Sequence, residues 1–486
     1  MRVLLVQPPT PLEVETLSSI DMVAPSMGLA YLAAVLEQHG YAVEILDAPA
    51  LQVTHEQLPR ELERRKPDLV GVTATTAVIG SALKTAETAK AVLPEATVVL
   101  GGAHLTFTQE TTMSLCPSVD VGVVGEGEYT LLELVQTLEK GGSLKDVKGI
   151  IYREDGRLVK TPPRPLIANL DELPFPARHL LPMDQYRAFG KKRILGTIFT
   201  SRGCPFSCIF CSSSLLFGKK FRARSPKNVV DEIEQFQREY NSKFVEIIDD
   251  IFILDRKRAE AICRELMERN LGTVWVCSAR IDLMTKELMQ MLRKAGCVMI
   301  YYGVESGVQR VVDLMKKGIK VDHAFKVIQW ARELGMESVA SFVVGIPGET
   351  WEEAVQTIKF AKKLNAEYAQ FAIATPFPGT ELYEMAKREG LLLTEDWSQY
   401  TVLKPVMRTR ELSAEQLKKL IRKCYLEYYL RPRIMWNYIR RGHARELLVN
   451  VIGHYLWQAV KAGVKGLFKP AASTPPPVDS ELRVKT

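Results

Sequence analysis

Three cysteines stand together in the segment Ser201-Arg202-Gly203-Cys204-Pro205-Phe206-Ser207-Cys208-Ile209-Phe210-Cys211, with the spacing C-x3-C-x2-C. Thiolates this close in one loop can converge on a metal centre, and soft sulfur ligands select zinc or an iron–sulfur cluster. Zinc needs a fourth ligand close by, but no Cys or His follows Cys211 until Cys263. A [4Fe–4S] cluster held by three cysteines would instead leave one iron open to a substrate.

The elements around these cysteines are predicted to form a partial β/α barrel over residues 191–400. Six strand candidates alternate with helix-period segments such as Val229–Tyr240 and Lys257–Glu268. The strand candidates are 194–200, 244–248, 274–277, 298–302, 338–344 and 368–374. The cysteines follow the first strand, and barrel active sites lie at the carboxyl ends of the strands.

Residues 1–145 are predicted to form a second α/β domain, a doubly wound (Rossmann-like) parallel sheet. Short apolar strand candidates at 3–6, 43–46, 69–73, 97–100 and 121–124 alternate with helical segments. Ligands of such sheets bind beyond the carboxyl ends of the strands. The loops expected there are rich in small residues, which permit close backbone approach to a large ligand: Gln7-Pro8-Pro9, Thr73–Thr76, Gly101–His104 and Gly125–Glu128.

The remaining segments connect or extend these domains. Residues 146–190 read as a hairpin, turning at Asp155-Gly156, followed by a proline-rich linker. Residues 401–470 read as a helical region, and residues 471–486 as a disordered tail.

Composition bounds the class of protein. The chain has 486 residues, and its 47% hydrophobic and 25% charged content is that of a globular protein. Eight cysteines are too sparse for a secreted disulfide framework. No apolar window is long enough for a membrane span or a signal peptide, so we expect a cytoplasmic protein.

The net charge of +7 is concentrated in one segment. Residues 431–469 hold eight Lys or Arg against one Glu, so the rest of the chain is close to neutral. A nucleic-acid-binding protein would usually carry its basic residues over the body, so no nucleic-acid partner is expected. Basic, aromatic helices at 431–469 would suit peripheral contact with an anionic membrane. The alternative is that they pack on the barrel and expose a basic face.

Residues 194–380 resemble the radical S-adenosylmethionine (SAM) enzymes. Beyond the cysteines, the matching elements are Asp249-Asp250, Arg280-x-Asp282, Gly303-Val304-Glu305-Ser306 and Val344–Thr350. The resemblance implies that Cys204, Cys208 and Cys211 ligate a [4Fe–4S] cluster whose open iron chelates SAM. It implies further roles toward SAM for Phe210 at the adenine, for Arg280 at the carboxylate, and for Gly303, Glu305 and Ser306 along the ligand. Asp249 and Asp250 would bind ribose or substrate, or would cap the helix near Asp255.

The N-terminal domain resembles that of the cobalamin-binding radical SAM enzymes, through Pro25–Leu32, Gly101-Gly102 and Val124–Glu128. The resemblance implies a cobalamin site at Ser26, Gly28, Thr73, Thr75, Gly101, Gly102, Gly125, Glu126 and Gly127. One departure is that the sequence lacks Asp-x-His-x-x-Gly, the motif that supplies histidine to cobalt in many cobalamin proteins. We therefore expect cobalt not to be ligated by that histidine, nor by His104. The alternative is a domain that has kept this fold and lost its cofactor.

The function implied is reductive cleavage of SAM and, with cobalamin, methylation of an unactivated carbon of a small or lipid-like substrate. An electron donor such as flavodoxin or ferredoxin would serve the cluster. The same radical chemistry without methyl transfer would give a cyclase, a carbon–carbon coupling enzyme or a mutase. A different class would be a non-catalytic iron–sulfur or RNA-binding protein. Methylthiotransferases share this domain order, but they would carry a C-terminal RNA-binding barrel where residues 411–470 read as helical.

Overall fold

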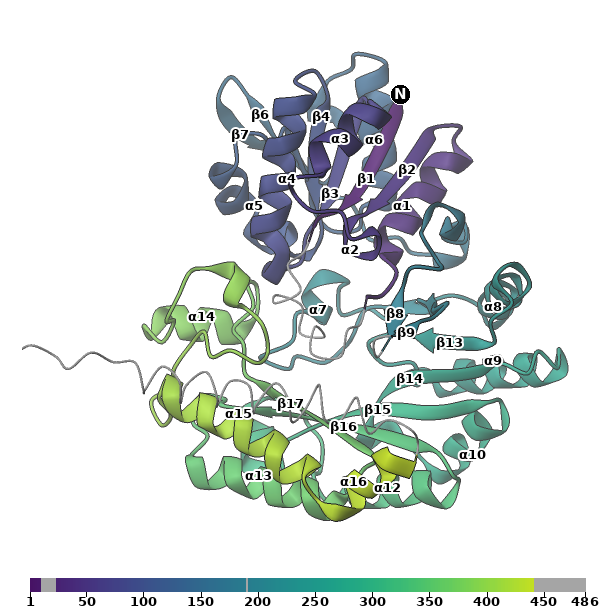
Figure 1. Ribbon diagram of the computed structural model, residues 1–486, viewed down its shortest axis with the longest axis vertical. Helices are drawn as coiled ribbons and strands as arrows, with labels where there is room; N and C mark the ends of the chain where they lie inside the picture. Colours follow the sequence, from purple (N-terminus) through teal and green to yellow (C-terminus); the bar gives the residue numbers. More distant parts are fainter. Residues whose placement is uncertain (10–22, 189–190, 441–486) are drawn as a thin grey trace, which may run out of the picture. The chain divides into compact units, whose positions relative to one another are not determined.

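The computed structural model describes residues 1–9, 23–188 and 191–440. Its first sheet has seven strands in the order β2-β1-β3-β4-β5-β6-β7 (Figure 1). The strands are β1 (Arg2–Gln7), β2 (Ala42–Asp47), β3 (Leu69–Thr73), β4 (Thr97–Gly101), β5 (Val121–Val123), β6 (Ile150–Glu154) and β7 (Arg157–Lys160). The first five are parallel, as their short apolar sequences predict.

Helices cover both faces of this sheet. They are α1 (Met27–Gln38), α3 (Leu58–Arg65), α4 (Ile79–Val92), α5 (Ala103–Leu115) and α6 (Glu128–Glu139). Residues of α3, α4 and α5, such as Leu58, Ala82 and Met113, share one core with Leu4 and Val70 of the sheet. Helix α1 packs beside α6 instead. The domain is therefore doubly wound, and the carboxyl ends of its parallel strands meet at one edge.

The predicted hairpin forms and continues this sheet. β6 pairs antiparallel with both β5 and β7. Asp155 and Gly156 turn the chain with φ of 49° and 74°, which a two-residue hairpin loop requires at both central positions. Ile150 and Ile151 are buried, so the hairpin is an edge of the first sheet as well as the start of the connection to the second.

The second sheet has six strands in the order β10-β13-β14-β15-β16-β17. They are β10 (Gly196–Ile198), β13 (Phe244–Ile247), β14 (Val274–Arg280), β15 (Cys297–Glu305), β16 (Glu337–Val344) and β17 (Tyr368–Ile373). All neighbours are parallel. Among the described residues no strand joins β10 to β17, so the barrel is open, and the predicted partial β/α barrel is confirmed.

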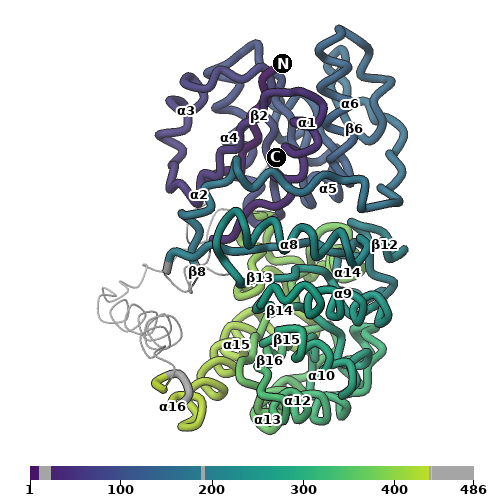
Figure 2. The backbone as a smooth tube through the Cα atoms, turned by 90° about the vertical axis from the view of Figure 1, so that its right-hand side faces the viewer, coloured from purple at the N-terminus to yellow at the C-terminus, as the bar shows by residue number. Residues whose placement is uncertain are grey.

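A row of helices covers the outer face of the second sheet, and Figure 2 shows it along one side of the barrel. The helices are α8 (Pro226–Tyr240), α9 (Arg256–Glu268), α10 (Lys286–Lys294), α12 (His323–Glu333) and α13 (Trp351–Leu364). Each contacts the next. Their starts are specified locally: Ser225 caps α8, Asp255 caps α9, and Thr350 with Glu353 forms a capping box on α13.

Helix α15 (Ala414–Tyr429) lies against β17, the last strand of the barrel. The Tyr429 hydroxyl donates to the Ala369 carbonyl oxygen at 2.7 Å and accepts from the Ala369 N–H at 3.2 Å. The Tyr425 hydroxyl donates to the Phe371 carbonyl oxygen at 3.0 Å. These tyrosines satisfy the open edge of the sheet, which would otherwise present unpaired backbone groups. The aromatic residues of α15 are therefore packing residues.

A single compact unit spans residues 1–430 and includes both sheets. Trp397 lies in the short 3-10 helix η7 (Trp397–Gln399) and packs against the apolar core of the first sheet. The centres of its ring and of the His104 ring are 5.3 Å apart. The helix α16 (Pro432–Arg440) follows, and most of the predicted basic segment, 441–469, together with the predicted tail, lies outside the described residues. No helix in the described part of the chain is long and apolar enough to cross a bilayer.

Candidate active site

The cysteines lie on a loop, residues 203–221, that follows β10 at its carboxyl end; we call it the cysteine loop. A short antiparallel ladder of β11 (Ser201–Arg202) and β12 (Arg222–Ala223) brings its two ends together. Gly203 opens the loop with φ of 94°, and a Cβ there would lie 2.3 Å from the Lys220 carbonyl oxygen. Glycine is therefore required immediately before Cys204.

Backbone hydrogen bonds hold the cysteine loop at three points. The Cys204 N–H donates to the Gly218 carbonyl oxygen at 3.2 Å. The Ile209 N–H donates to the Met315 carbonyl oxygen at 3.1 Å, and the Leu382 N–H donates to the Ile209 carbonyl oxygen at 2.9 Å. The thiols therefore project from a backbone that is fixed by two other parts of the barrel.

The three thiols are free and half-buried. Burial raises the pKa of Cys204 and of Cys208, and the nearby charge of Cys211 raises both further. The three sulfurs are thus within electrostatic range of one another. Within the described residues, no group of three or more His, Cys, Asp or Glu side chains is arranged to hold a single metal ion. The cysteine loop itself holds three thiols and no fourth Cys or His, a donor set that fits a cluster with one open iron better than a four-coordinate zinc ion.

A buried ion pair between Lys317 and Glu305 stands beside Cys208. Lys317 Nζ lies 2.5 Å from Glu305 Oε1, and the ammonium lowers the pKa of Cys208 against the effect of burial. Gly303 gives this pair its room, because a Cβ at Gly303 would lie 2.3 Å from Glu305 Oε1 and 2.6 Å from Lys317 Nζ. Gly303 and Glu305, at the end of β15, are therefore brought to the cysteine loop.

Arg280 also reaches the cysteine loop, but its guanidinium is already engaged. Its Nε and Nη2 atoms lie 3.0 and 3.1 Å from the Asp282 carboxylate oxygens. Nη2 donates to the Lys317 carbonyl oxygen at 2.8 Å, and the guanidinium lies 3.5 Å from the centre of the Phe206 ring. Arg280 is thus a buried, stacked member of the site wall, rather than a surface ion pair.

The acidic pair at the end of β13 divides into two roles. The Asp249 carboxylate accepts from the N–H and hydroxyl groups of both Thr200 and Ser201, so it holds the chain that leads from β10 into the cysteine loop. Asp250 lies near Cys204 and hydrogen-bonds Ser213, while burial raises the pKa of its carboxyl group. Neither residue caps α9.

Two further residues predicted to contact SAM lie in packed surroundings. The Ser306 hydroxyl is fully buried, lies 2.8 Å from the Thr357 hydroxyl oxygen and accepts from the Val308 N–H. Phe210 is partly buried against an apolar cluster that includes Ile346. Ser306 therefore braces the turn after β15 and does not face open space.

A cavity of about 220 Å³ lies at the carboxyl ends of β3 and β4. We call it the glycine cavity. It brings together most of the residues predicted for cobalamin: Gly28, Thr73, Gly101, Gly102, Gly125, Glu126 and Gly127. A Cβ on Gly28 or Gly125 would meet no atom within 4 Å, so backbone faces open space there. Ser26 and Thr75 do not line the cavity, and no histidine of the described part of the chain does.

The Glu126 and Glu128 side chains are committed to ion pairs. Glu126 Oε1 lies 2.9 Å from both Arg202 Nη1 and Arg222 Nη1, and Glu126 Oε2 accepts from the Ile167 N–H at 2.7 Å. Glu128 Oε1 lies 2.5 Å from Arg202 Nη2. The two arginines belong to the ladder that closes the cysteine loop, so these carboxylates link the glycine cavity to that loop.

Sequence reasoning missed several residues of the site. Arg202 stands two residues before Cys204, and this position next to the cysteine motif could have pointed to a role in the site. Lys317 and Arg222 carry no local signal, because their partners are supplied by other elements. Phe199, Leu216 and Phe217 complete the glycine cavity from the barrel side. His104 is buried beside Thr76, and burial lowers its pKa to about 4.

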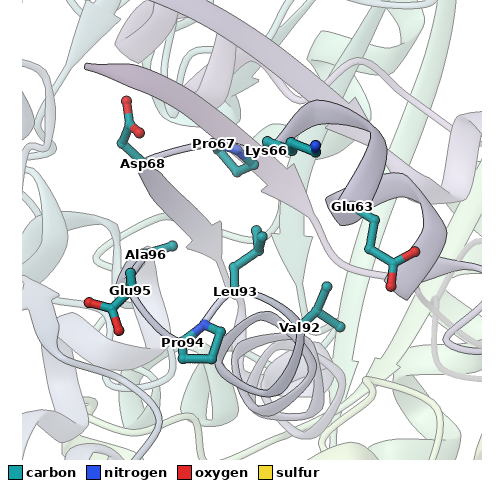
Figure 3. A pocket seen from close by; sticks show the side chains of 9 residues that line it. All are labelled: Glu63, Lys66, Pro67, Asp68, Val92, Leu93, Pro94, Glu95 and Ala96. Carbon is teal, nitrogen blue, oxygen red and sulfur yellow. The ribbon is translucent and has the colours of Figure 1, made fainter.

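Another cavity, of about 440 Å³, lies at the opposite ends of the strands, before β3 and β4 (Figure 3). It is lined by Glu63, Lys66, Pro67, Asp68, Val92, Leu93, Pro94, Glu95 and Ala96. Figure 3 shows the carboxylates of Glu63, Asp68 and Glu95 on different sides of the cavity, where they do not converge. The Asp68 carboxylate accepts from the Arg2 N–H at 2.7 Å. The side chains that line this cavity therefore form no cluster that could bind a metal ion or catalyse a reaction.

Comparisons with known families match the two domains separately. Residues 16–135 match the family described as B12 binding domain, and residues 198–361 match the Radical SAM superfamily. The cobalamin-binding type of fold and the radical SAM barrel, which the resemblance to known families implied above, are thereby confirmed.

Relatives cover nearly the whole chain. An uncharacterized methyltransferase of Pyrococcus horikoshii is 42% identical over 91% of this chain and 95% of its own length. An anaerobic magnesium-protoporphyrin IX monomethyl ester cyclase of Rubrivivax gelatinosus is 31% identical over 89% of this chain and 79% of its own length. The structure of the radical SAM methyltransferase TsrM of Kitasatospora setae, with cobalamin and a [4Fe–4S] cluster bound, superposes with a TM-score of 0.70 at 20% identity over 89% of each chain.

Proposed function

Because this chain belongs to the radical SAM enzymes that carry an N-terminal cobalamin-binding domain, we propose that it methylates an unactivated carbon of a small or lipid-like substrate. The observation that carries the proposal is the pairing of two sites in one compact unit. A half-buried loop of three free cysteines stands at the end of β10, and the glycine cavity is joined to it through Arg202.

Cys204, Cys208 and Cys211 would hold a [4Fe–4S] cluster, and the loop offers no fourth Cys or His ligand. When bound, the cluster supplies the electron that cleaves SAM, and cobalamin supplies a carrier for the methyl group. The chain itself supplies positioning: Lys317 and Arg280 place positive charge beside Cys208, which favours its thiolate. Gly303 and Glu305 stand where SAM would lie.

The glycine cavity would hold cobalamin mainly through shape. Open backbone at Gly28 and Gly125 admits a large planar ligand, and Leu32, Val123 and Leu131 supply apolar contacts. Among the described residues that line the cavity there is no histidine, and the absence of a histidine ligand to cobalt stays a prediction. Tyr31 and Phe217 add two aromatic rings to the lining of the cavity.

The decisive experiment is anaerobic purification with hydroxocobalamin supplied, followed by iron, sulfide and cobalt analysis and a SAM-cleavage assay. We expect about four irons and one cobalt per chain. Cys208→Ala is expected to lose the cluster and SAM cleavage, while Cys424→Ala, a buried thiol in α15, keeps the iron. Iron content unaffected by Cys208→Ala would contradict the assignment.

A second outcome, ring closure without methyl transfer, is favoured by one observation: the relative from Rubrivivax gelatinosus is named a cyclase. Product mass distinguishes the two. Methylation adds one methyl group to the substrate and yields S-adenosylhomocysteine alongside 5′-deoxyadenosine. A cyclase would yield 5′-deoxyadenosine without S-adenosylhomocysteine.

The cellular setting also belongs to this proposal. A flavodoxin- or ferredoxin-like donor would reduce the cluster in the cytoplasm. The excess of basic residues in 431–469 supports peripheral contact with an anionic membrane, where a lipid-like substrate would be found. Flotation with vesicles containing anionic lipid tests this contact. Absence of the intact protein from the floating fraction would remove the membrane from the proposal.

A further inference from the structure

Arg202 and Arg222 lie opposite each other where the two ends of the cysteine loop meet. The β11–β12 register pairs them directly across the antiparallel ladder. Their side chains are only 10% and 4% exposed. Like charges placed directly opposite each other destabilise a strand pair, and water cannot screen them well here. By itself, this ladder would hold the loop ends together poorly.

The negative charges that balance these two arginines come from the first domain, between the end of β5 and the start of α6. Glu126 contacts both arginines, and Glu128 contacts Arg202 alone. The two carboxylates are themselves buried, so two negative and two positive charges form one nearly dry, balanced network. Removing one partner from such a network leaves an uncompensated buried charge, which is strongly unfavourable. The Glu126–Glu128 segment therefore stabilises the ladder that joins the two ends of the cysteine loop.

Arg202 is at the same time part of the wall of the glycine cavity. Its guanidinium lies 5.9 Å from the centre of the Tyr31 ring and 5.7 Å from that of Phe217. All three side chains line the cavity. Cys204 follows Arg202 by two residues, so a ligand in the cavity would contact a side chain whose backbone directly precedes the cysteine loop.

We propose that Glu126 and Glu128 are positioning residues, which couple occupation of the glycine cavity to closure of the cysteine loop through Arg202 and Arg222. This inference rests on the proposed function, because it assigns cobalamin to the cavity and the cluster to the loop. Coupling between two binding sites is reciprocal. Loading the cluster should therefore tighten cobalamin binding by the same factor by which cobalamin favours the loaded loop.

The test measures the Kd of hydroxocobalamin by visible absorption, under anaerobic conditions, with full-length protein that either lacks or contains the reconstituted cluster. In the wild type we expect loading to lower this Kd by about fivefold or more, the lower end of usual coupling factors. Arg222→Gln should bring the ratio of the Kd without the cluster to the Kd with it below about twofold, although Arg222 itself is not a lining residue of the cavity. Glu128→Gln, which keeps side-chain size and leaves the Glu126–Arg222 pair, should also lower the ratio.

Glu133→Gln is the matched control. It removes a carboxylate from the same helix, α6, whose partner Arg164 lies outside both the ladder and the cavity. It should show the wild-type ratio. A wild-type ratio in both Arg222→Gln and Glu128→Gln would overturn the inference, as would equal weakening of cobalamin binding with and without the cluster, which marks a merely structural role. No cobalamin binding by any form would instead contradict the proposed function.

Discussion

Gly303 shows how one missing side chain shapes the barrel end of the site. Its Cα faces the buried Lys317–Glu305 pair, and a methyl group there would collide with both charged ends. We expect Gly303→Ala to weaken SAM binding to the cluster-loaded protein about tenfold, or about 1.4 kcal/mol, because the pair must move into the SAM site. Calorimetric titration with SAM measures this.

Gly80→Ala is the control for Gly303→Ala, because a Cβ at Gly80 on α4 would meet no atom within 4 Å. It should leave SAM affinity unchanged. If Gly303→Ala bound SAM as tightly as the wild type, the Lys317–Glu305 pair would not be next to the bound ligand.

Ionisation of Glu349 should make the free energy of unfolding depend on pH. Its side chain is fully buried, and burial raises its pKa to about 7, although the Gly345 N–H donates to it. The folded protein then holds a proton that the unfolded chain releases near pH 4.3. The free energy of unfolding should therefore fall as pH rises from about 4.3 to 7, by on the order of 3 kcal/mol in all.

Urea unfolding of cluster-free protein at pH 5 and pH 8 tests this expectation. Glu349→Gln should remove most of the difference between the two pH values, because the amide does not titrate. Glu352→Gln, at an exposed neighbouring position, should retain it. A pH dependence that survives Glu349→Gln would show that another group is responsible.

At the scale of elements, the turn from β4 into α5 depends on one of two adjacent glycines. Gly102 has φ of 100°, and a Cβ there would lie 2.6 Å from the Ala74 carbonyl oxygen, whereas a Cβ on Gly101 would meet only Val123 at 3.9 Å. For a residue other than glycine, a backbone conformation with such a positive φ costs about 1–3 kcal/mol of folding free energy. Gly102→Ala should destabilise the protein by at least that amount and should weaken hydroxocobalamin binding.

Gly101→Ala provides the comparison for Gly102→Ala, since it adds the same methyl group one residue away. It should cost well under 1 kcal/mol, because its neighbourhood has room. Thermal unfolding and absorption titration of the two variants distinguish them. Equal effects would mean that the turn tolerates a side chain at both positions.

At the scale of the whole molecule, the segment after the barrel holds the first sheet through Trp397. Its ring packs on the core of that sheet and lies 5.3 Å from His104 and 4.7 Å from Tyr400. Trp397→Ala should lower the free energy of unfolding by about 2–4 kcal/mol, somewhat less than for a fully buried aromatic residue. It should also speed proteolysis between the two sheets.

Trp436→Ala is the control for Trp397→Ala, because Trp436 is 64% exposed. It should alter neither unfolding nor the proteolytic pattern. Wild-type stability of Trp397→Ala would mean that other contacts, such as the ion pairs of Glu126 and Glu128 with Arg202 and Arg222, suffice to hold the first sheet.

Patterns of neighbouring residues were enough to predict the helices, the strands and the three-cysteine site. Short apolar strands alternating with helices predict parallel sheets, and the thiol spacing around Cys208 predicts a cluster, because both are properties of neighbours along the chain. The partners of the buried polar side chains, by contrast, became known only from the folded chain. Glu126 pairs with arginines 76 and 96 residues away, and Ser306 turns to Thr357. Lys317 reaches Glu305 in the same way. These pairings arise because folding buries residues that are distant in the sequence next to each other. A buried polar or charged group is stable only when it has a hydrogen-bonding or oppositely charged partner.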